Sequence, residues 1–375
     1  MPTDRTAHGR AERYHASCRV PAVSTRIPSL DGLRAASITL LMYAHAMGTR
    51  GFPDALGTRH SPLHHTGSLG VRVFFVISGY LITHLLRGEF ERTGTLSLRE
   101  FYLRRLFRIF PAYYTLLLVL AGLSAAHVIA LRDGDLLSAF TFTTNFHFDR
   151  AWYVGHTWSL SVEEQFYLLW PAAMLLAGLR RALGVVVAVI VAAPVARVLV
   201  HLYVPSQRDG IGETFYTVAD ALAAGCALSL ARERLGASPR YLRLLRSPLF
   251  LLAPLYCAAS IFVAERPRID YPLGQTLLNF SIALIVDRAV RVPDDAVGRL
   301  LNTRPMVFVG TLSYALYLTQ QLFLNRSDAG WHAAFPQNVA LAFAAALVMH
   351  YAVEKPFLRL RSRVDRSHSP RARTP

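Results

Sequence analysis

Arg34 and His45 lie eleven positions apart in a mostly apolar segment that begins at Leu30. Eleven residues advance an α-helix by roughly 16 Å and turn it about 20° past three full turns, so both side chains are expected on one face at different depths. Ionisable side chains inside a bilayer are costly and usually line a cavity or a path. The segment therefore favours an enzyme that works within a membrane.

Two adjacent carboxylates, Glu163 and Glu164, follow in the segment from His156 to Pro171. They are predicted near the outer end of a fourth span, at a depth similar to that of His45. A carboxylate that orients an imidazole is the arrangement by which a general base removes a proton from a hydroxyl group. The alternative is an interfacial acidic pair with Trp158 as part of an aromatic belt.

Arginines cluster between Phe101 and Tyr114, at the expected cytoplasmic entrance of the third span. The spacing of Arg104, Arg105 and Arg108 predicts a shared face, where guanidinium groups could hold phosphates through paired hydrogen bonds. The alternative is that these charges only keep the helix end on the inner side of the membrane.

The remaining candidates are predicted to be structural or to line the substrate path. Arg72 is interpreted either as a functional cation or as a side chain that extends outward to water, whereas small Ser78 and Gly79 favour close helix packing. The acids among the others are expected to need partners inside the membrane. These other candidates are Trp158, Ser161, Tyr167, Asp220, Ser313, Tyr314 and Glu354.

The composition predicts an all-α integral membrane protein. Of the 375 residues, 53% are hydrophobic and only 17% are charged. About ten transmembrane helices are expected, at about 30–48, 68–86, 112–130, 158–178, 183–203, 213–231, 248–265, 272–290, 306–325 and 334–353.

Arginine distribution predicts the orientation of these spans. If the N-terminal tail is inside, the inner segments hold 28 arginines and the outer loops hold 8. Both termini are therefore expected in the cytoplasm. The net charge of +16 is then explained by topology and by anionic lipid, so membrane lipid is an expected partner and nucleic acid is not.

The domain organisation is predicted to be simple. Residues 1–27 are interpreted as a disordered cytoplasmic tail, 28–358 as one transmembrane domain, and 359–375 as a basic cytoplasmic tail. Cys18, Cys226 and Cys257 show no metal-binding or disulfide spacing. His60, His64 and His65 are interpreted as exposed loop residues, and no metal is expected.

Seven segments together resemble the membrane-bound acyltransferase family 3, in the order typical of that family. The resemblance extends from about residue 28 to 362. It rests on Arg34 with His45, Gly70 to Ile82, Arg104 to Tyr114, Trp158 to Tyr167, Asp220 to Gly225, Gly310 to Leu318, and Tyr351 to Phe357.

This resemblance implies an O-acyltransferase of a bacterial cytoplasmic membrane. It would move an acyl group, most often acetyl, from cytoplasmic acyl-CoA to a hydroxyl of a sugar or glycosylated acceptor. His45 would be the general base assisted by Glu163, while Arg34 and the group Arg104, Arg105 and Arg108 would hold the donor. A transporter or flippase that moves a glycolipid without chemistry is the rival from another class.

Two departures from the family pattern concern substrate identity. The family often has a His where this chain has Gln320 and Gln321, and Val218 takes a place often held by Arg two residues before Asp220. An extracytoplasmic hydrolase-like domain, fused to some members, is also not found. A separate protein is therefore expected to provide any second transfer step outside the membrane.

Overall fold

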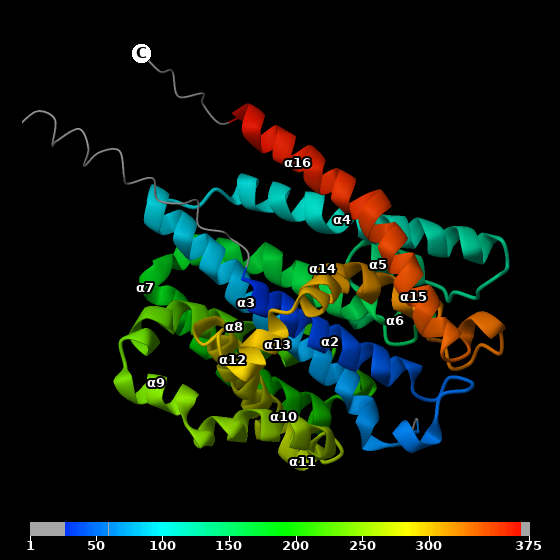
Figure 1. The fold of residues 1–375 in the computed structure, drawn as a ribbon, viewed down its shortest axis with the longest axis horizontal. Coiled ribbons are helices and arrows are strands. Elements are labelled where there is room, and N and C mark those ends of the chain that lie inside the picture. Colours follow the sequence, from blue (N-terminus) through cyan, green and yellow to red (C-terminus); the bar gives the residue numbers. More distant parts are fainter. Residues whose placement is uncertain (1–26, 59, 369–375) are drawn as a thin grey trace, which may run out of the picture.

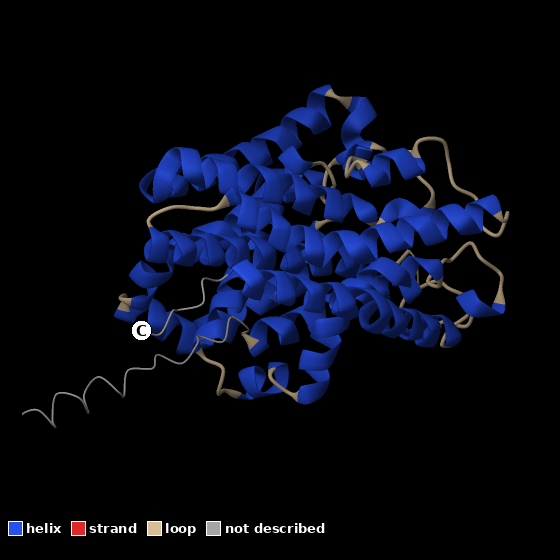
Figure 2. Ribbon diagram, turned by 90° about the horizontal axis from the view of Figure 1, so that it is seen from above, coloured by secondary structure: helices blue, strands red, loops and turns tan. Residues whose placement is uncertain are grey.

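The computed structural model describes residues 27–58 and 60–368, and all regular structure within these ranges is helical (Figures 1 and 2). This agrees with the predicted all-α class. The N-terminal tail predicted for residues 1–27 lies, except for Ile27, outside the described residues. Helix α16 (Lys355–His368) extends into the predicted C-terminal segment, whose last residues, 369–375, are also outside them.

Helix α2 (Pro28–Ala46) is continuous, as the spacing of Arg34 and His45 requires. It begins at Pro28, where the missing N–H costs no helical hydrogen bond, and ends where Met47 turns to an extended conformation. It packs between α3 (Thr66–Thr93) and α14 (Arg304–Thr319). Arg34 and His45 therefore lie on one rigid element.

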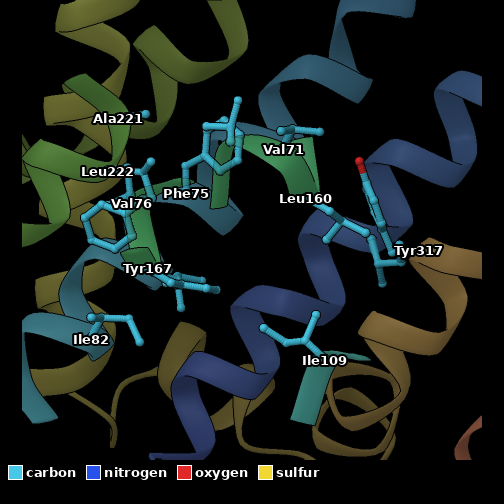
Figure 3. Packing of buried hydrophobic residues seen from close by; sticks show 14 of the residues in the cluster. Val71, Phe75, Val76, Ile82, Ile109, Leu160, Tyr167, Ala221, Leu222 and Tyr317 are labelled. Atoms are coloured by element: carbon cyan, nitrogen blue, oxygen red, sulfur yellow. The ribbon is translucent and has the colours of Figure 1, made fainter. Parts of the chain in front are cut away.

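Helix α3 crosses α8 (Phe215–Gly236) so closely that glycine is needed on both sides. A Cβ on Gly79 would collide with the carbonyl oxygen of Leu222, and one on Gly225 would collide with that of Val76. Figure 3 shows Val76 and Leu222 in the core at this crossing. The predicted packing role of Gly79 is confirmed, because small residues let helix backbones approach each other.

The number of membrane spans differs from the prediction. Six helices of the described part are long and apolar enough to cross a membrane, or seven if the bent pair α9 (Pro239–Arg246) and α10 (Leu252–Val263) forms one span. Helix α14 has only 16 residues. The predicted spans 158–178 and 183–203 both lie in α7 (Thr157–Tyr203), where a break at Gly178, with φ 70° and ψ 163°, separates two helical parts. The count of ten is not confirmed.

The connections gather at two ends of the molecule. In Figure 1 the link from α3 to α4 (Leu98–Ala125) lies at the left, as does α9, whereas the loops around residues 47–65 and 323–336 lie at the right. The remaining helices are α5 (Asp135–Phe140), α6 (Trp152–Gly155), α11 (Pro267–Ile269), α12 (Gln275–Arg291), α13 (Ala296–Leu301) and α15 (Gln337–Val348). The end with the loops around residues 47–65 and 323–336, next to His45 in the last turn of α2, is called the His45 end below, and the opposite end is called the Arg34 end.

Candidate functional site

The imidazole of His45 is held by an amide at one end of α2. Its Nδ1 lies 2.7 Å from Oε1 of Gln320, in the turn that follows α14, and its ring packs edge-on against Trp152 at 5.2 Å between centroids. Gln320 is completely buried. An amide oxygen only accepts hydrogen bonds, so Nδ1 of His45 carries a proton, and in the neutral ring the lone pair is on Nε2. This is the tautomer that a general base on Nε2 requires.

A second imidazole repeats this arrangement beside the first. Nδ1 of His156 lies 2.7 Å from Oε1 of Gln321, and that oxygen also accepts the His156 backbone N–H at 3.1 Å. Tyr317 donates to the His156 carbonyl at 2.7 Å, and its hydroxyl lies 2.5 Å from that of Ser159. His156 was not among the residues predicted from the sequence. Two adjacent amides at the end of an apolar helix, Gln320 and Gln321, were the sequence feature that could have indicated two polar partners there.

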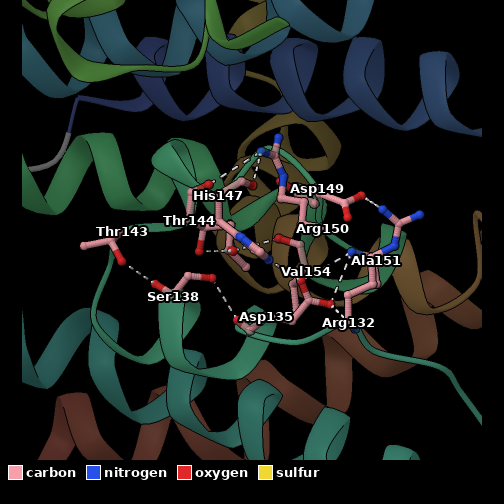
Figure 4. Close-up of polar contacts among 12 residues, drawn as sticks. Arg132, Asp135, Ser138, Thr143, Thr144, His147, Asp149, Arg150, Ala151 and Val154 are labelled. Carbon is pink, nitrogen blue, oxygen red and sulfur yellow. Dashed lines mark hydrogen bonds and ion pairs between the residues drawn. The ribbon is translucent and has the colours of Figure 1, made fainter. Parts of the chain in front are cut away.

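A polar network orders the chain that leads into α7 (Figure 4). The buried carboxylate of Asp135 accepts from the backbone N–H groups of Arg132 and Ala151 and lies 3.1 Å from Nε2 of His147. Arg150 donates to the carbonyl oxygens of His147 and Gly155. These bonds fix the positions of Trp152 and His156, because both residues directly follow the network in the chain.

The predicted direct pair of His45 and Glu163 is not formed. Both residues are described, yet the hydrogen bond of His45 goes to Gln320 and that of Glu163 goes to Ser78, whose hydroxyl donates at 2.6 Å. Helix α7 is already helical from Thr157, so Glu163 lies about seven residues, or roughly 10 Å, deeper than His156. Ser78 therefore has a polar role that the sequence did not predict, in addition to the packing role that was predicted for it.

Glu163 instead belongs to a charged cluster at the Arg34 end of α2. Its carboxylate interacts electrostatically with Arg34 and Arg105, and the three guanidinium groups of Arg34, Arg105 and Arg108 interact with one another. The guanidinium of Arg105 lies 5.6 Å from the ring centroid of Tyr167. The structure thus brings together four predicted residues from three helices, α2, α4 and α7, with Tyr167 beside them.

Arg104 does not join this cluster, although its spacing predicted a face shared with Arg105 and Arg108. Its Nη2 donates to Glu89 at 2.8 Å, an ion pair that connects α4 to α3. Adjacent helical residues point about 100° apart, so Arg104 and Arg105 cannot share one face. Arg108 is exposed and makes no ion pair with any residue that the structure describes.

The other predicted residues are distributed over the helix bundle. Arg197 pairs with Asp220 through two hydrogen bonds of 3.1 and 3.0 Å, and both side chains are fully buried. Asp220 therefore pairs with a cation on α7, and not with the Arg that the family often has at the position of Val218. Arg72 donates to two neutral amides, Gln275 at 2.5 Å and Asn279 at 3.2 Å.

The last five predicted residues have local partners or buried positions. Glu354 lies 2.7 Å from Nδ1 of His350, and the hydroxyl of Tyr314 donates to the Ile109 carbonyl at 2.9 Å. Ser161 donates to a carbonyl of its own helix, Ser313 is buried on α14, and Trp158 packs against Phe75 at 6.0 Å between ring centroids.

Comparison with known families agrees with this arrangement. The model of the acyltransferase domain of acyltransferase family 3 matches residues 27–353. The chain belongs to this family. With its apolar helices, it is a multi-pass bacterial membrane protein. No solved structure matches the chain with significance.

Three curated relatives show what the chain is similar to. It is 28% identical to the peptidoglycan O-acetyltransferase OatA of Listeria monocytogenes, over 78% of this chain and 48% of that protein. It is 29% identical to the putative peptidoglycan O-acetyltransferase YrhL of Bacillus subtilis, over 92% and 56%. It is 25% identical to the O-acetyltransferase OatA of Staphylococcus aureus, over 78% and 49%. The chain spans about half the length of these relatives.

Proposed function

We propose that this protein transfers an acetyl group from acetyl-CoA to a hydroxyl group of a cell-envelope glycan. The observation that carries the proposal is the pair of sites at the two ends of α2. One end holds an imidazole in the base-competent tautomer, and the other holds a cluster of arginines. The two sites are separated by about eleven residues, or roughly 16 Å along the helix axis.

The arginine cluster is the proposed donor site. Arg34, Arg105 and Arg108 repel one another, and three nearby acids offset part of their charge: Asp31, which lies 3.7 Å from Arg34, Glu163 and Glu164. A phosphate group between them would relieve this repulsion and accept charge-assisted hydrogen bonds, for which the planar guanidinium group is well suited. In acetyl-CoA the long pantetheine arm separates the phosphates from the thioester. A donor whose phosphates are bound at one end of α2 can therefore react at the other end.

His45 is the proposed general base of the transfer. Nε2 takes the proton of the acceptor hydroxyl, and the hydroxyl oxygen forms a bond to the thioester carbonyl carbon. The carbon–sulfur bond breaks, and the CoA thiolate leaves and takes the proton back from Nε2. Gln320 holds the imidazole throughout, because its oxygen accepts the Nδ1 proton, and the lone pair is therefore on Nε2 before the transfer and again after it.

The names of the relatives support a glycan acceptor. Two of the three are called peptidoglycan O-acetyltransferases, one of them putatively. Peptidoglycan and other envelope polysaccharides offer sugar hydroxyls at the membrane surface, and His45 is in the last turn of its helix. A separate extracytoplasmic transferase is proposed wherever the acceptor lies beyond direct reach.

Acetyl transfer by the purified protein in lipid nanodiscs tests the proposal. With labelled acetyl-CoA and peptidoglycan fragments, His45→Ala should reduce kcat about 10²- to 10⁴-fold and leave acetyl-CoA affinity unchanged. Arg108→Ala should weaken acetyl-CoA binding about tenfold or more. Arg99→Ala is the matched control, since it removes an exposed arginine from the same helix.

Each outcome has a clear consequence. Near-normal turnover by a folded His45→Ala variant would exclude the general-base mechanism. Equal donor affinity of the Arg108→Ala and Arg99→Ala variants would mean that the cluster does not bind CoA. Movement of a labelled glycolipid across the bilayer without acetyl transfer would favour the transporter alternative.

A further inference from the structure

A polar cavity of about 270 Å³ lies at the His45 end, on the other side of the first turns of α7. It is lined by α3, the first turn of α7, α10, α12 and the turn that precedes α8. Its walls combine aromatic rings with charged and amide groups, among them Arg72, Trp158, Asp209, Asp270, Tyr271 and Gln275. The mechanism proposed above assigns no role to this space.

The polar wall of the cavity is held in place by its own hydrogen bonds. Gln275 connects Arg72 to Asp270, because its Oε1 accepts from Arg72 at 2.5 Å and its Nε2 donates to Asp270 at 2.7 Å. Arg72 is only 8% exposed and makes no ion pair with any described residue. Its guanidinium has five N–H groups, so donors remain for a ligand at this wall.

The chemistry of the lining suits an uncharged sugar. Trp158 and Tyr271 offer flat apolar rings for the C–H face of a sugar ring, while the carboxylates and the guanidinium can bind its hydroxyl groups. The charge of Asp270 is offset by nearby Arg72, and Glu213 is paired with Arg150. The remaining exposed carboxylate, Asp209, disfavours a negatively charged ligand.

The size of the cavity limits the ligand to about one sugar residue. Its volume equals that of about nine water molecules in the liquid, which is comparable to the ring and substituents of a single hexose. A longer glycan would have to continue outside the cavity.

The position of the cavity connects it to His45. Trp158 follows His156 by two residues, and His156 is bonded to Gln321, the neighbour of the glutamine that holds His45. Glu213, at the rim, is paired with Arg150, which also donates to the carbonyl of Gly155 just before α7. The same rigid segment therefore positions both the cavity and the imidazoles.

We infer that this cavity binds one uncharged sugar residue of the acceptor glycan, next to the residue that receives the acetyl group. The inference rests on the proposed function for the identity of the glycan as acceptor. A sugar bound here anchors the polymer, and an adjoining sugar extends past the first turn of α7 to His45. The cavity is thus a binding subsite for the acceptor and takes no part in the chemical step.

Binding of N-acetylglucosamine tetramer to the full chain in nanodiscs, measured by calorimetry without acetyl-CoA, tests this inference. Trp158→Ala should weaken tetramer binding about tenfold or more. Asp209→Asn, at an exposed residue of the lining, should weaken it as well. Matched controls at the same end are Trp331→Ala and Asp54→Asn, both at exposed residues outside the cavity lining, and these should bind like the unmodified protein.

The outcomes separate this inference from the proposed function. Sugar binding that depends on Trp158 and Asp209 but is followed by no acetyl transfer would support the cavity and overturn the proposed function. Acetyl transfer with unchanged sugar affinity in both cavity variants would overturn the cavity alone. Absence of tetramer binding, or tighter binding of a tetragalacturonate, would overturn the assignment to an uncharged sugar.

Discussion

Replacement of Gln320 by Leu is the most direct test of how His45 is held. The change keeps a similar volume in a position with no solvent exposure, and it removes the oxygen that lies 2.7 Å from Nδ1 of His45. The Nδ1 proton then has no acceptor, and the imidazole is free to change tautomer or to rotate. A donor left without its partner in a buried site costs about 1–3 kcal/mol.

This free energy gives the size of the kinetic effect. If the bond is needed in the transition state, about 1–3 kcal/mol corresponds to a decrease of roughly 5- to 150-fold in kcat. The KM for acetyl-CoA should stay unchanged, because the arginine cluster lies about 16 Å away along α2. The assay is the initial rate of acetyl transfer in nanodiscs at varied acetyl-CoA concentration, with unfolding temperature measured on the same samples.

Two further variants make the result specific to His45. Gln320→Glu keeps an acceptor oxygen at the same reach, so it should recover most of the lost rate. Gln321→Leu removes a buried amide from the same turn but leaves the bond to His45 intact, so it reports general damage. A folded Gln320→Leu variant with normal kcat would refute the reasoning, and so would equal losses of kcat in the two Leu variants.

Three predictions concern stability, measured as thermal or denaturant unfolding of the purified protein. Asp220→Leu should destabilise the fold by about 3–5 kcal/mol because it leaves Arg197 buried and unpaired. Adding Arg197→Leu should recover much of the lost stability. Unchanged stability of the Asp220→Leu variant would contradict a structural ion pair. Gly79→Ala should cost about 1–3 kcal/mol by forcing α3 from α8, whereas Gly88→Ala on the same helix meets no atom within 4 Å and should be neutral. The backbone N–H of Gly298, together with Arg288, holds the pKa of Asp295 below its usual value. The ionised carboxylate therefore stabilises the fold above the unfolded pKa, and this stabilisation is lost as pH falls through the folded pKa. Asp295→Ala should cost about 0.5–2 kcal/mol at neutral pH and nothing in acid.

The all-α membrane class and the geometry of α2 could be predicted from the sequence. Hydropathy and helical periodicity are local properties, so the common face of Arg34 and His45 follows from their spacing alone. The family motifs likewise could be recognised in the chain itself. The number of spans was harder to predict, because α14, with 16 residues, is too short to pass as a span, and the segment with α9 and α10 is bent.

The partners of the ionisable residues were decided only by tertiary structure. His45 and Gln320 are 275 positions apart, and Arg197 and Asp220 come from different helices. A hydrogen bond tolerates a few tenths of an ångström, whereas a shift of one helical turn moves a side chain by about 5.4 Å. An error of one or two turns in the depth of α7 was therefore enough to pair Glu163 with His45 in the prediction. The contacts of α7 with α3 and α4 place Glu163 with Ser78 and the arginines.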